Sequence, residues 1–154
     1  MPTDEDRFRE TLDEAQCRRL LTTVTIGRLG FTEDALPAIL PVTFTLQNGY
    51  VLIAVRHDSS VVNAVRRSVV ALQVDDYDPA AGTGWSVTVV GPSRVVRDPD
   101  EIRALYGGLP DRWTRPGRCL VRVQVRLVHG WLVPSRPVEP SREGAGELQG
   151  SAPP

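Results

Sequence analysis

The sequence predicts a mainly β fold, an antiparallel β-barrel with peripheral helices, and three features lead to this prediction. Residues 121–127 (Val-Arg-Val-Gln-Val-Arg-Leu) alternate apolar and polar side chains, which is the pattern of a half-buried strand. Asn48-Gly49 separates two apolar, β-branched runs and is therefore a strong hairpin signal. The other strand patterns are joined by turns rather than by regular crossover helices, which disfavours a doubly wound parallel sheet.

Six segments rich in β-branched and apolar residues are predicted as strands, which gives a six-stranded barrel. They span residues 24–31, 36–46, 50–55, 69–74, 85–96 and 121–127. Glu33-Asp34 is predicted as the turn between the first two strands. Pro37 and Pro41 place the second strand at an edge or a bulge, and Gly91-Pro92 marks a bulge in the fifth.

Three short helices are expected around the barrel. The first spans residues 11–22 and begins with the capping-box pattern Thr-Leu-Asp-Glu. The second is expected to have Ser60 as its N-cap and to carry Arg66 and Arg67 in its last turn, where cations are favoured. The third begins at Asp98, which is followed by proline at the first helical position.

The length and composition predict one domain with short extensions. The chain has 154 residues, of which 41% are hydrophobic and 24% charged, as in ordinary globular proteins. We assign residues 1–11 to a flexible N-terminus and residues 12–133 to the folded domain. Residues 134–154 are rich in Pro, Ser, Gly and Glu, so they are predicted to be a disordered tail.

The charged residues and cysteines exclude several classes of function. The 18 basic residues are all arginine, so Schiff-base chemistry and a Walker-type phosphate loop, which both need lysine, are excluded. A formal net charge of -1 disfavours nucleic acid as a partner. Cys17 and Cys119 form no metal or disulfide pattern, and His57 and His129 are too few for a histidine-rich metal site, so no metal is expected. The acidic N-terminus and the lack of a long apolar run predict a cytoplasmic protein without a membrane span.

Three groups of segments, taken in this order and spacing, resemble a known family. They are residues 26–31 with 40–44, residues 55–63 running into 66–69, and residues 84–87 followed by 90–91. Over residues 12–133 the chain resembles the pyridoxamine 5'-phosphate oxidase-like FMN-binding split barrels. It is most similar to the small actinobacterial members related to nitroimidazole reductases.

The resemblance implies a six-stranded split barrel that forms a homodimer with FMN at the subunit interface. Pro41, Val42 and Thr43 would lie beside the isoalloxazine ring, with Thr43 at the ring edge. Trp85 and Ser86 would form a wall of the flavin pocket.

The phosphate of the flavin would be approached by Arg56, Ser59 and Ser60. Arginine suits phosphate through its planar fork, and the N–H groups at a helix start attract an anion. Many flavin-binding relatives carry lysine where this chain has Ser60, and a neutral hydroxyl forms a weaker bond to phosphate than a charged donor. Arg66 or Arg67 could compensate if either turned toward the site.

His57 and Asn63 have more than one interpretation. His57 could hydrogen-bond the flavin, donate a proton to a substrate, ligate haem iron, or be a surface histidine beside Asp58. Asn63 could reach the cofactor or form a hydrogen bond within its own helix.

The function that the resemblance implies is an FMN-dependent oxidoreductase that transfers hydride or electrons to a small-molecule substrate. A non-catalytic dimeric module that binds flavin or haem is one alternative. A deazaflavin-dependent reductase is another, but that cofactor has a long acidic tail that needs a broad basic groove, and the arginines are scattered along the sequence.

Overall fold

The computed structural model describes residues 10–133, which form eight strands and four helices. The strands are β1 (Glu10–Leu12), β2 (Ile26–Glu33), β3 (Leu36–Gln47), β4 (Tyr50–Arg56), β5 (Val69–Asp78), β6 (Thr83–Val96), β7 (Arg118–Gln124) and β8 (Leu127–Val133). The helices are α1 (Glu14–Leu21), α2 (Ser60–Ala64), α3 (Pro99–Leu105) and the short 3-10 helix η2 (Asp111–Trp113). The predicted tail, residues 134–154, lies outside the described residues.

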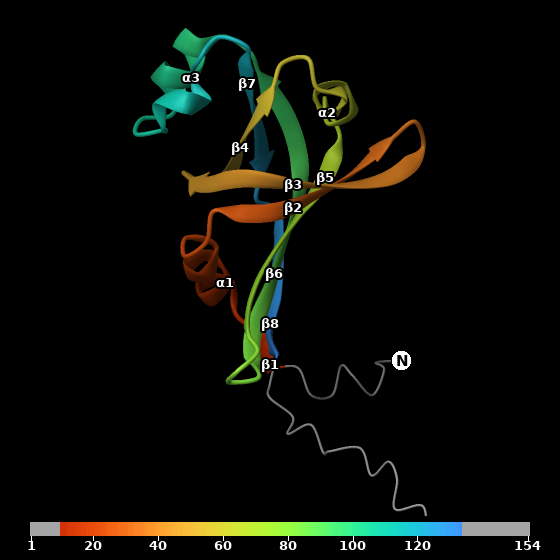
Figure 1. The fold of residues 1–154 in the computed structure, drawn as a ribbon, viewed down its shortest axis with the longest axis vertical. Helices are drawn as coiled ribbons and strands as arrows, with labels where there is room; N and C mark the ends of the chain where they lie inside the picture. Colours follow the sequence, from red (N-terminus) through yellow and green to blue (C-terminus); the bar gives the residue numbers. More distant parts are fainter. Residues whose placement is uncertain (1–9, 134–154) are drawn as a thin grey trace, which may run out of the picture.

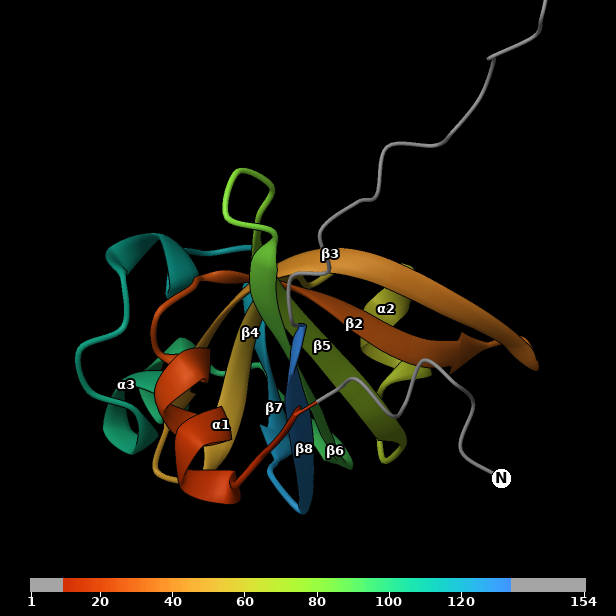
Figure 2. The same cartoon turned by 90° about the horizontal axis from the view of Figure 1, so that it is seen from below.

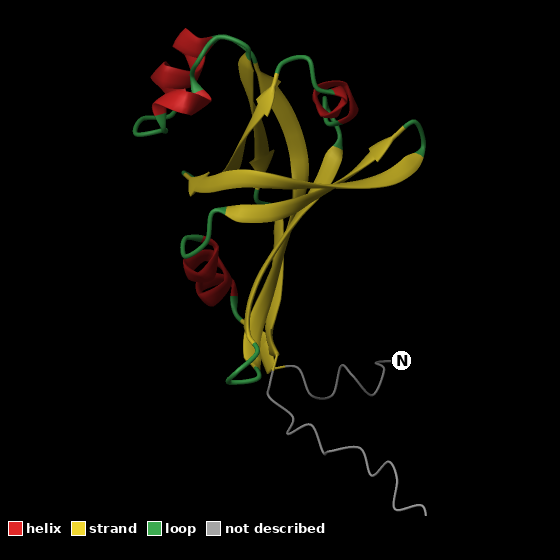
Figure 3. Ribbon diagram, viewed as in Figure 1, coloured by secondary structure: helices red, strands yellow, loops and turns green. Residues whose placement is uncertain are grey.

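All strand pairings are antiparallel, and six strands close into a ring. The sheet order is β1-β8-β6-β5-β2-β3-β4-β7, and a further pairing between β6 and β7 closes the ring. Figure 1 shows β5, β6 and β8 running together below the crossing hairpin of β2 and β3. Strands dominate the fold and the helices lie at its periphery (Figure 3), so the predicted mainly β antiparallel architecture is confirmed.

The ring closes because β6 changes partners along its length. Its first part pairs with β5 and β8, whereas Ser93 to Val96 pair with β7. At the change, a Cβ on Gly91 would lie 1.7 Å from the carbonyl oxygen of Gln124. Only glycine fits this close approach of two strands, and Pro92 is the last β6 residue that pairs with β5.

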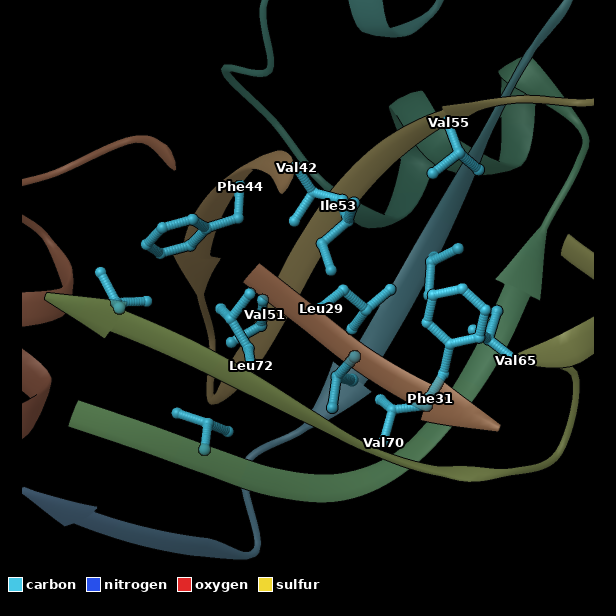
Figure 4. Close-up of a cluster of buried hydrophobic side chains, with 14 of the residues drawn as sticks. Leu29, Phe31, Val42, Phe44, Val51, Ile53, Val55, Val65, Val70 and Leu72 are labelled. Atoms are coloured by element: carbon cyan, nitrogen blue, oxygen red, sulfur yellow. The ribbon is translucent and has the colours of Figure 1, made fainter. Parts of the chain in front are cut away.

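Two clusters of buried apolar side chains hold the structure together. The larger cluster fills the space between the ring strands, and Figure 4 shows Leu29, Val42 and Ile53 pointing into it. The smaller cluster lies under α3, where Ile102 packs with Leu52 and other buried side chains. Fully burying an aliphatic side chain stabilises the fold by about 1.5–3 kcal/mol.

Helix α1 covers one side of the long strands, as Figure 2 shows from below. Its buried Cys17 and Leu21 belong to the larger cluster. The capping box is formed by Asp13 and Gln16, so the N-cap lies two residues after the predicted N-cap Thr11. Thr11 cannot cap the helix because it belongs to β1. Glu10 and Thr11, expected in the flexible N-terminus, thus pair with β8.

Three other local predictions differ from the structure. The run 121–127, predicted as one strand, is divided between β7 and β8, because the N–H of Arg126 leaves the ladder and donates to the carbonyl of Val90. The N-cap of α2 is Ser59, and the helix ends at Ala64, before Arg66 and Arg67. The turn after β2 is Asp34-Ala35, where both residues have positive φ.

Within residues 10–133 no helix is long and apolar enough to cross a membrane.

Candidate functional site

The outer face of β2, β3, β5 and β6 gathers several of the predicted site residues. Pro41 lies opposite Arg28, which in turn lies opposite Gln73 on β5. Thr43 and Ser86 share this face, because directly paired residues and their second neighbours point to the same side of a sheet. Pro41 and Thr43 are exposed, and Ser86 is half-buried.

A polar network crosses this outer face from β2 to β6. Arg28 Nη1 donates to Gln73 Oε1 at 3.2 Å and lies 3.4 Å from the carboxylate of Asp75. Gln73 Nε2 in turn donates to Asp75 Oδ2 at 2.9 Å and to Ser86 Oγ at 3.2 Å. The Ser86 hydroxyl therefore accepts from Gln73 and keeps its own proton for another partner.

Large aliphatic side chains surround the network and are exposed in the single chain. The exposed fraction is 64% for Ile26, 75% for Ile39, 68% for Val69 and 64% for Leu127. The strand register places these side chains on the same outer face as Arg28 and Gln73. Groups of exposed apolar side chains with polar neighbours are typical of binding surfaces.

Val42 and Trp85 point to the opposite face of their strands. Val42 is 7% exposed and belongs to the larger buried cluster, against which the half-buried Trp85 also packs. Strand alternation accounts for this, because neighbours in a strand point to opposite faces. Val42 and Trp85 therefore point inward, whereas their neighbours Thr43 and Ser86 point to the outer sheet face.

The turn between β4 and α2 holds the second group of predicted residues. Arg56 binds Asp58 through two bonds, from Nε to Oδ1 at 3.0 Å and from Nη2 to Oδ2 at 2.7 Å. The hydrogen bond from Arg56 lowers the pKa of the Asp58 carboxyl. Both side chains are exposed, and solvent screens an exposed ion pair so that it contributes little to stability, which leaves Arg56 able to exchange Asp58 for an incoming anion.

His57 is anchored to the loop that precedes β7. Its backbone N–H donates to the carbonyl oxygen of Gly117 at 3.0 Å, and its Nδ1 lies 2.9 Å from the same oxygen. A carbonyl oxygen can only accept, so Nδ1 is the protonated nitrogen in this contact. Nε2 of the exposed ring is then left to interact with a ligand.

The start of α2 is capped by a hydroxyl and bordered by acidic residues. Ser59 Oγ accepts from the N–H of Val61 at 3.3 Å. Ser60 and Asn63 are exposed and line a pocket of about 440 Å³ with Ala64. The other lining residues are Thr32 and Glu33 at the end of β2 and Asp34 in the turn that follows. In the single chain this pocket is therefore acidic on the side that faces α2.

Arg66 and Arg67 do not line the pocket of Ser60, so they do not supply there the positive charge that a lysine at position 60 would provide. They line a different cavity together with Arg94 and Arg97. These four arginines are far apart in the sequence, but the fold brings the two segments that carry them to one place. No sequence pattern pointed to Arg28, Gln73 or Arg94, since only the strand register places Arg28 beside Gln73 and, elsewhere, Arg94 beside Arg122.

The predicted residues thus lie in three places on the chain. Pro41, Thr43 and Ser86 are on the outer sheet face, whereas Val42 and Trp85 are on the inner face. The remaining residues, at the β4–α2 turn and in α2, are Arg56, His57, Ser59, Ser60 and Asn63. Thr43 also lines a pocket of about 310 Å³ beside the loop that follows α3.

Comparison with known proteins places this geometry in context. The chain is 39% identical over 125 residues to Rv0080, an uncharacterized protein of Mycobacterium tuberculosis, and the match covers 77% of this chain and 82% of that protein.

Two solved structures share the fold. The FAD binding protein from Mycobacterium smegmatis is 30% identical, with a TM-score of 0.65 over 80% of this chain and 96% of that chain. The FAD and heme binding protein from the same organism is 13% identical, with a TM-score of 0.65 over 83% of this chain and 75% of that one, which shows a shared fold alone. The family model for pyridoxamine 5'-phosphate oxidase matches residues 13–142. The chain therefore belongs to the pyridoxamine 5'-phosphate oxidase family.

Proposed function

We propose that this protein is a homodimeric flavoprotein that binds FMN on the outer face of the β2–β3–β5–β6 sheet and transfers hydride or electrons to a small molecule. The observation that carries the proposal is the network of Arg28, Gln73 and Ser86 beside Pro41 and Thr43. Family membership and the 30% identical FAD binding protein support flavin as the ligand class.

The residues of this face fit the isoalloxazine ring in chemical type. The ring needs hydrogen-bond donors and acceptors along its polar edge and apolar contacts over its planes. Arg28 and Gln73 supply donors, and Ser86 supplies a hydroxyl. The exposed aliphatic side chains Ile26 and Ile39 supply apolar surface.

A second copy of the chain would complete the site. The single chain presents the exposed aliphatic side chains without a cover, and a homodimer through this face would bury them. Burial of apolar surface contributes about 25 cal/mol per Å². The same contact would enclose the ring and exclude water from it.

The phosphate of FMN is assigned to the β4–α2 turn. Arg56 would exchange Asp58 for the phosphate, since the existing ion pair is exposed and weak. Ser59 and Ser60 add neutral donors at the helix start, but Glu33 and Asp34 oppose an anion there. We therefore expect FMN to bind more weakly than it would with a positively charged residue at position 60.

When bound, the flavin supplies the hydride and electron transfer, and the protein residues position it and its substrate. His57 is the candidate proton donor, in its doubly protonated form, because Gly117 occupies Nδ1–H and a second proton is then carried by Nε2. The proton to be donated would thus lie on Nε2 of His57, in the β4–α2 turn next to Arg56.

The test is titration of the full chain, freed of bound ligand, with FMN, FAD, riboflavin, haem and a deazaflavin coenzyme in separate cells. Quenched flavin fluorescence and a perturbed visible spectrum with FMN support the proposal. Reduced FMN on the protein should then pass electrons to a small quinone faster than free reduced FMN does.

Two results contradict parts of the proposal. Binding of haem or the deazaflavin coenzyme without binding of FMN would overturn the choice of cofactor. FMN binding with no acceleration of electron transfer would overturn the oxidoreductase role and leave a flavin-binding module.

A further inference from the structure

Two adjoining cavities beside the C-terminal end of β6 are lined by arginine, and we call them together the arginine groove. The first has a volume of about 580 Å³ and the second of about 320 Å³. They share Pro92 and Arg94, so they lie next to each other along β6. The arginines that line the groove are Arg66, Arg67, Arg94, Arg97, Arg122 and Arg126.

Among residues 10–133 no aspartate or glutamate forms an ion pair with these six arginines, and only Glu101 acts on one of them, Arg122, from a longer distance. The lining of both cavities contains no aspartate or glutamate. The ion pairs of the described residues use other arginines, namely Arg18, Arg28, Arg56 and Arg103. In a chain with a formal net charge of -1, the groove is therefore a local concentration of positive charge.

The two central arginines are held side by side. Arg94 on β6 lies directly opposite Arg122 on β7. Side chains in such positions have Cβ atoms about 4.5–5.5 Å apart, and like charges there destabilise a sheet. Arg122 is fixed from two sides, by the ring of Tyr50 at 4.7 Å and by a 3.2 Å hydrogen bond to Tyr106 Oη. An anion between the two guanidinium groups would relieve the repulsion.

The segment that carries Arg66 and Arg67 is fixed against β6. Ser93 is 1% exposed, and its N–H donates to the carbonyl of Ser68 at 2.7 Å. Its hydroxyl lies at hydrogen-bond distance from the carbonyls of Val65 and Ser68. Arg67 has a φ of 53°, which non-glycine residues rarely adopt. The backbone on both sides of Arg66 and Arg67 is therefore anchored to β6, and both arginines line the same cavity as Arg94 and Arg97.

We propose that the arginine groove binds the diphosphate group of a small organic ligand. Guanidinium groups pair with phosphate oxygens through two parallel N–H bonds, and two adjoining cavities can hold two linked phosphates. The concave cavities are of the size that holds small ligands. They favour such a ligand over nucleic acid, which binds along extended basic surfaces.

The arginine groove is separate from the flavin site proposed above. None of its arginines lies in the pocket of Ser60 or in the network of Gln73. The sources of the diphosphate are a nucleoside diphosphate, the ADP half of FAD and a nicotinamide coenzyme. These sources share one chemistry, and separate titrations distinguish them.

The test is isothermal titration calorimetry of the full chain, without flavin, using inorganic pyrophosphate, inorganic phosphate, ADP, FAD and NADPH. We expect pyrophosphate and ADP to bind at least about tenfold more tightly than phosphate, and higher salt to weaken both. The tightest of ADP, FAD and NADPH identifies the source of the diphosphate.

Two arginine variants and one control locate the binding. Arg94→Ala and, as a second variant, Arg97→Ala should each weaken ADP binding by about tenfold or more. Arg19→Ala removes an exposed arginine from α1, outside the groove, and should change the affinity less than twofold. Circular dichroism checks that each variant is folded.

The outcomes that overturn the proposal are equally definite. Pyrophosphate that binds no better than phosphate would overturn it, as would pyrophosphate binding without ADP binding. An Arg94→Ala or Arg97→Ala protein that is folded and keeps full affinity would also overturn it. Tighter binding of a single-stranded oligonucleotide than of any diphosphate would assign the groove to nucleic acid instead. Because pyrophosphate, phosphate, ADP and NADPH carry no flavin ring, their results do not depend on whether FMN binds, and FAD binding counts for the groove only where Arg94→Ala weakens it.

Discussion

Gln73 Nε2 donates to Ser86 Oγ at 3.2 Å across the β5–β6 pair, so an amide and a hydroxyl from two strands act together on the outer sheet face. The same amide group also donates to Asp75. Gln73 thus connects the Arg28–Asp75 pair to Ser86.

Removing this amide should weaken flavin binding without unfolding the protein. We expect Gln73→Leu to lower FMN affinity up to about tenfold, the value of a lost hydrogen bond of about 0.5–1.5 kcal/mol. Fluorescence titration measures the affinity. Gln124→Leu, which replaces an exposed glutamine of β7 opposite Tyr50 and outside this face, is the matched control and should leave FMN affinity unchanged. Equal affinities of the Gln73 and Gln124 variants would argue against a flavin on this face.

A lysine at the start of α2 should strengthen binding of the flavin phosphate. In Ser60→Lys a charged donor replaces a hydroxyl, and charged hydrogen bonds are about twice as strong as neutral ones. We expect higher FMN affinity but unchanged riboflavin affinity, since riboflavin has no phosphate. Thr83→Lys, at an exposed strand end, controls for the added charge. If Ser60→Lys left FMN affinity unchanged, Ser60 would not face the phosphate.

The turn after β2 should become more stable with glycine. Ala35 has a φ of 63°, a left-handed conformation that costs about 1–2 kcal/mol for residues with a Cβ. We expect Ala35→Gly to raise the unfolding free energy by about 0.5–1 kcal/mol in urea titrations, because part of the gain is offset by greater freedom of the unfolded chain. Ala81→Gly, in a turn where the residue has no positive φ, should instead lower it. A loss of stability in both variants would contradict the strained turn.

Closure of the strand ring depends on the lack of a side chain at residue 91. Gly91→Ala places a Cβ at 1.7 Å from the Gln124 carbonyl oxygen, so β6 and β7 must separate. We expect a loss of about 3 kcal/mol or more in unfolding free energy. Gly107→Ala is the matched control, since its Cβ would meet nothing within 4 Å, and its effect should stay within about 0.5 kcal/mol. Similar melting temperatures for the two variants would show that this contact is not tight.

The two buried thiols should lower stability at alkaline pH. Cys17 and Cys119 are both 0% exposed, and burial raises the pKa of each thiol above its ordinary value of 9.0. As pH rises, the thiols of the unfolded chain therefore lose their protons before those of the folded protein. The contribution of the two thiols to the free energy of unfolding is thus fully present below pH 9 and is lost as pH rises above it. A thiol reagent such as DTNB should label neither cysteine of the native protein at pH 8 and both after unfolding. Rapid labelling of the native protein would contradict this.

How far sequence reasoning reaches depends on whether a feature is local. The Asn48-Gly49 hairpin was predictable because both turn residues adopt positive φ, which this pair of residues favours. The β6–β7 pairing was not, since Ser93 and Val123 are brought together only by the complete ring. Alternation at residues 121–127 continues across the break between β7 and β8, so the pattern alone could not locate the break.

The site residues show the same division. Arg56, His57 and Ser59 are adjacent in sequence, and their common location at the β4–α2 turn was predictable. That Ser86 faces outward while Trp85 packs inward follows from strand register, which the sequence does not reveal. The arginine groove depends on contacts between segments far apart in the chain.

The most direct test of the proposed flavin site is the mass and flavin content of the purified complex, measured by light scattering coupled to absorbance at the flavin band. Wild-type protein should be a dimer with one FMN per chain. Ile39→Asp, which puts a charge on the outer sheet face at its most exposed aliphatic residue, should be a monomer without FMN, whereas Leu105→Asp on α3 should resemble wild type. An Ile39→Asp protein that is still a dimer and keeps its flavin would contradict the account.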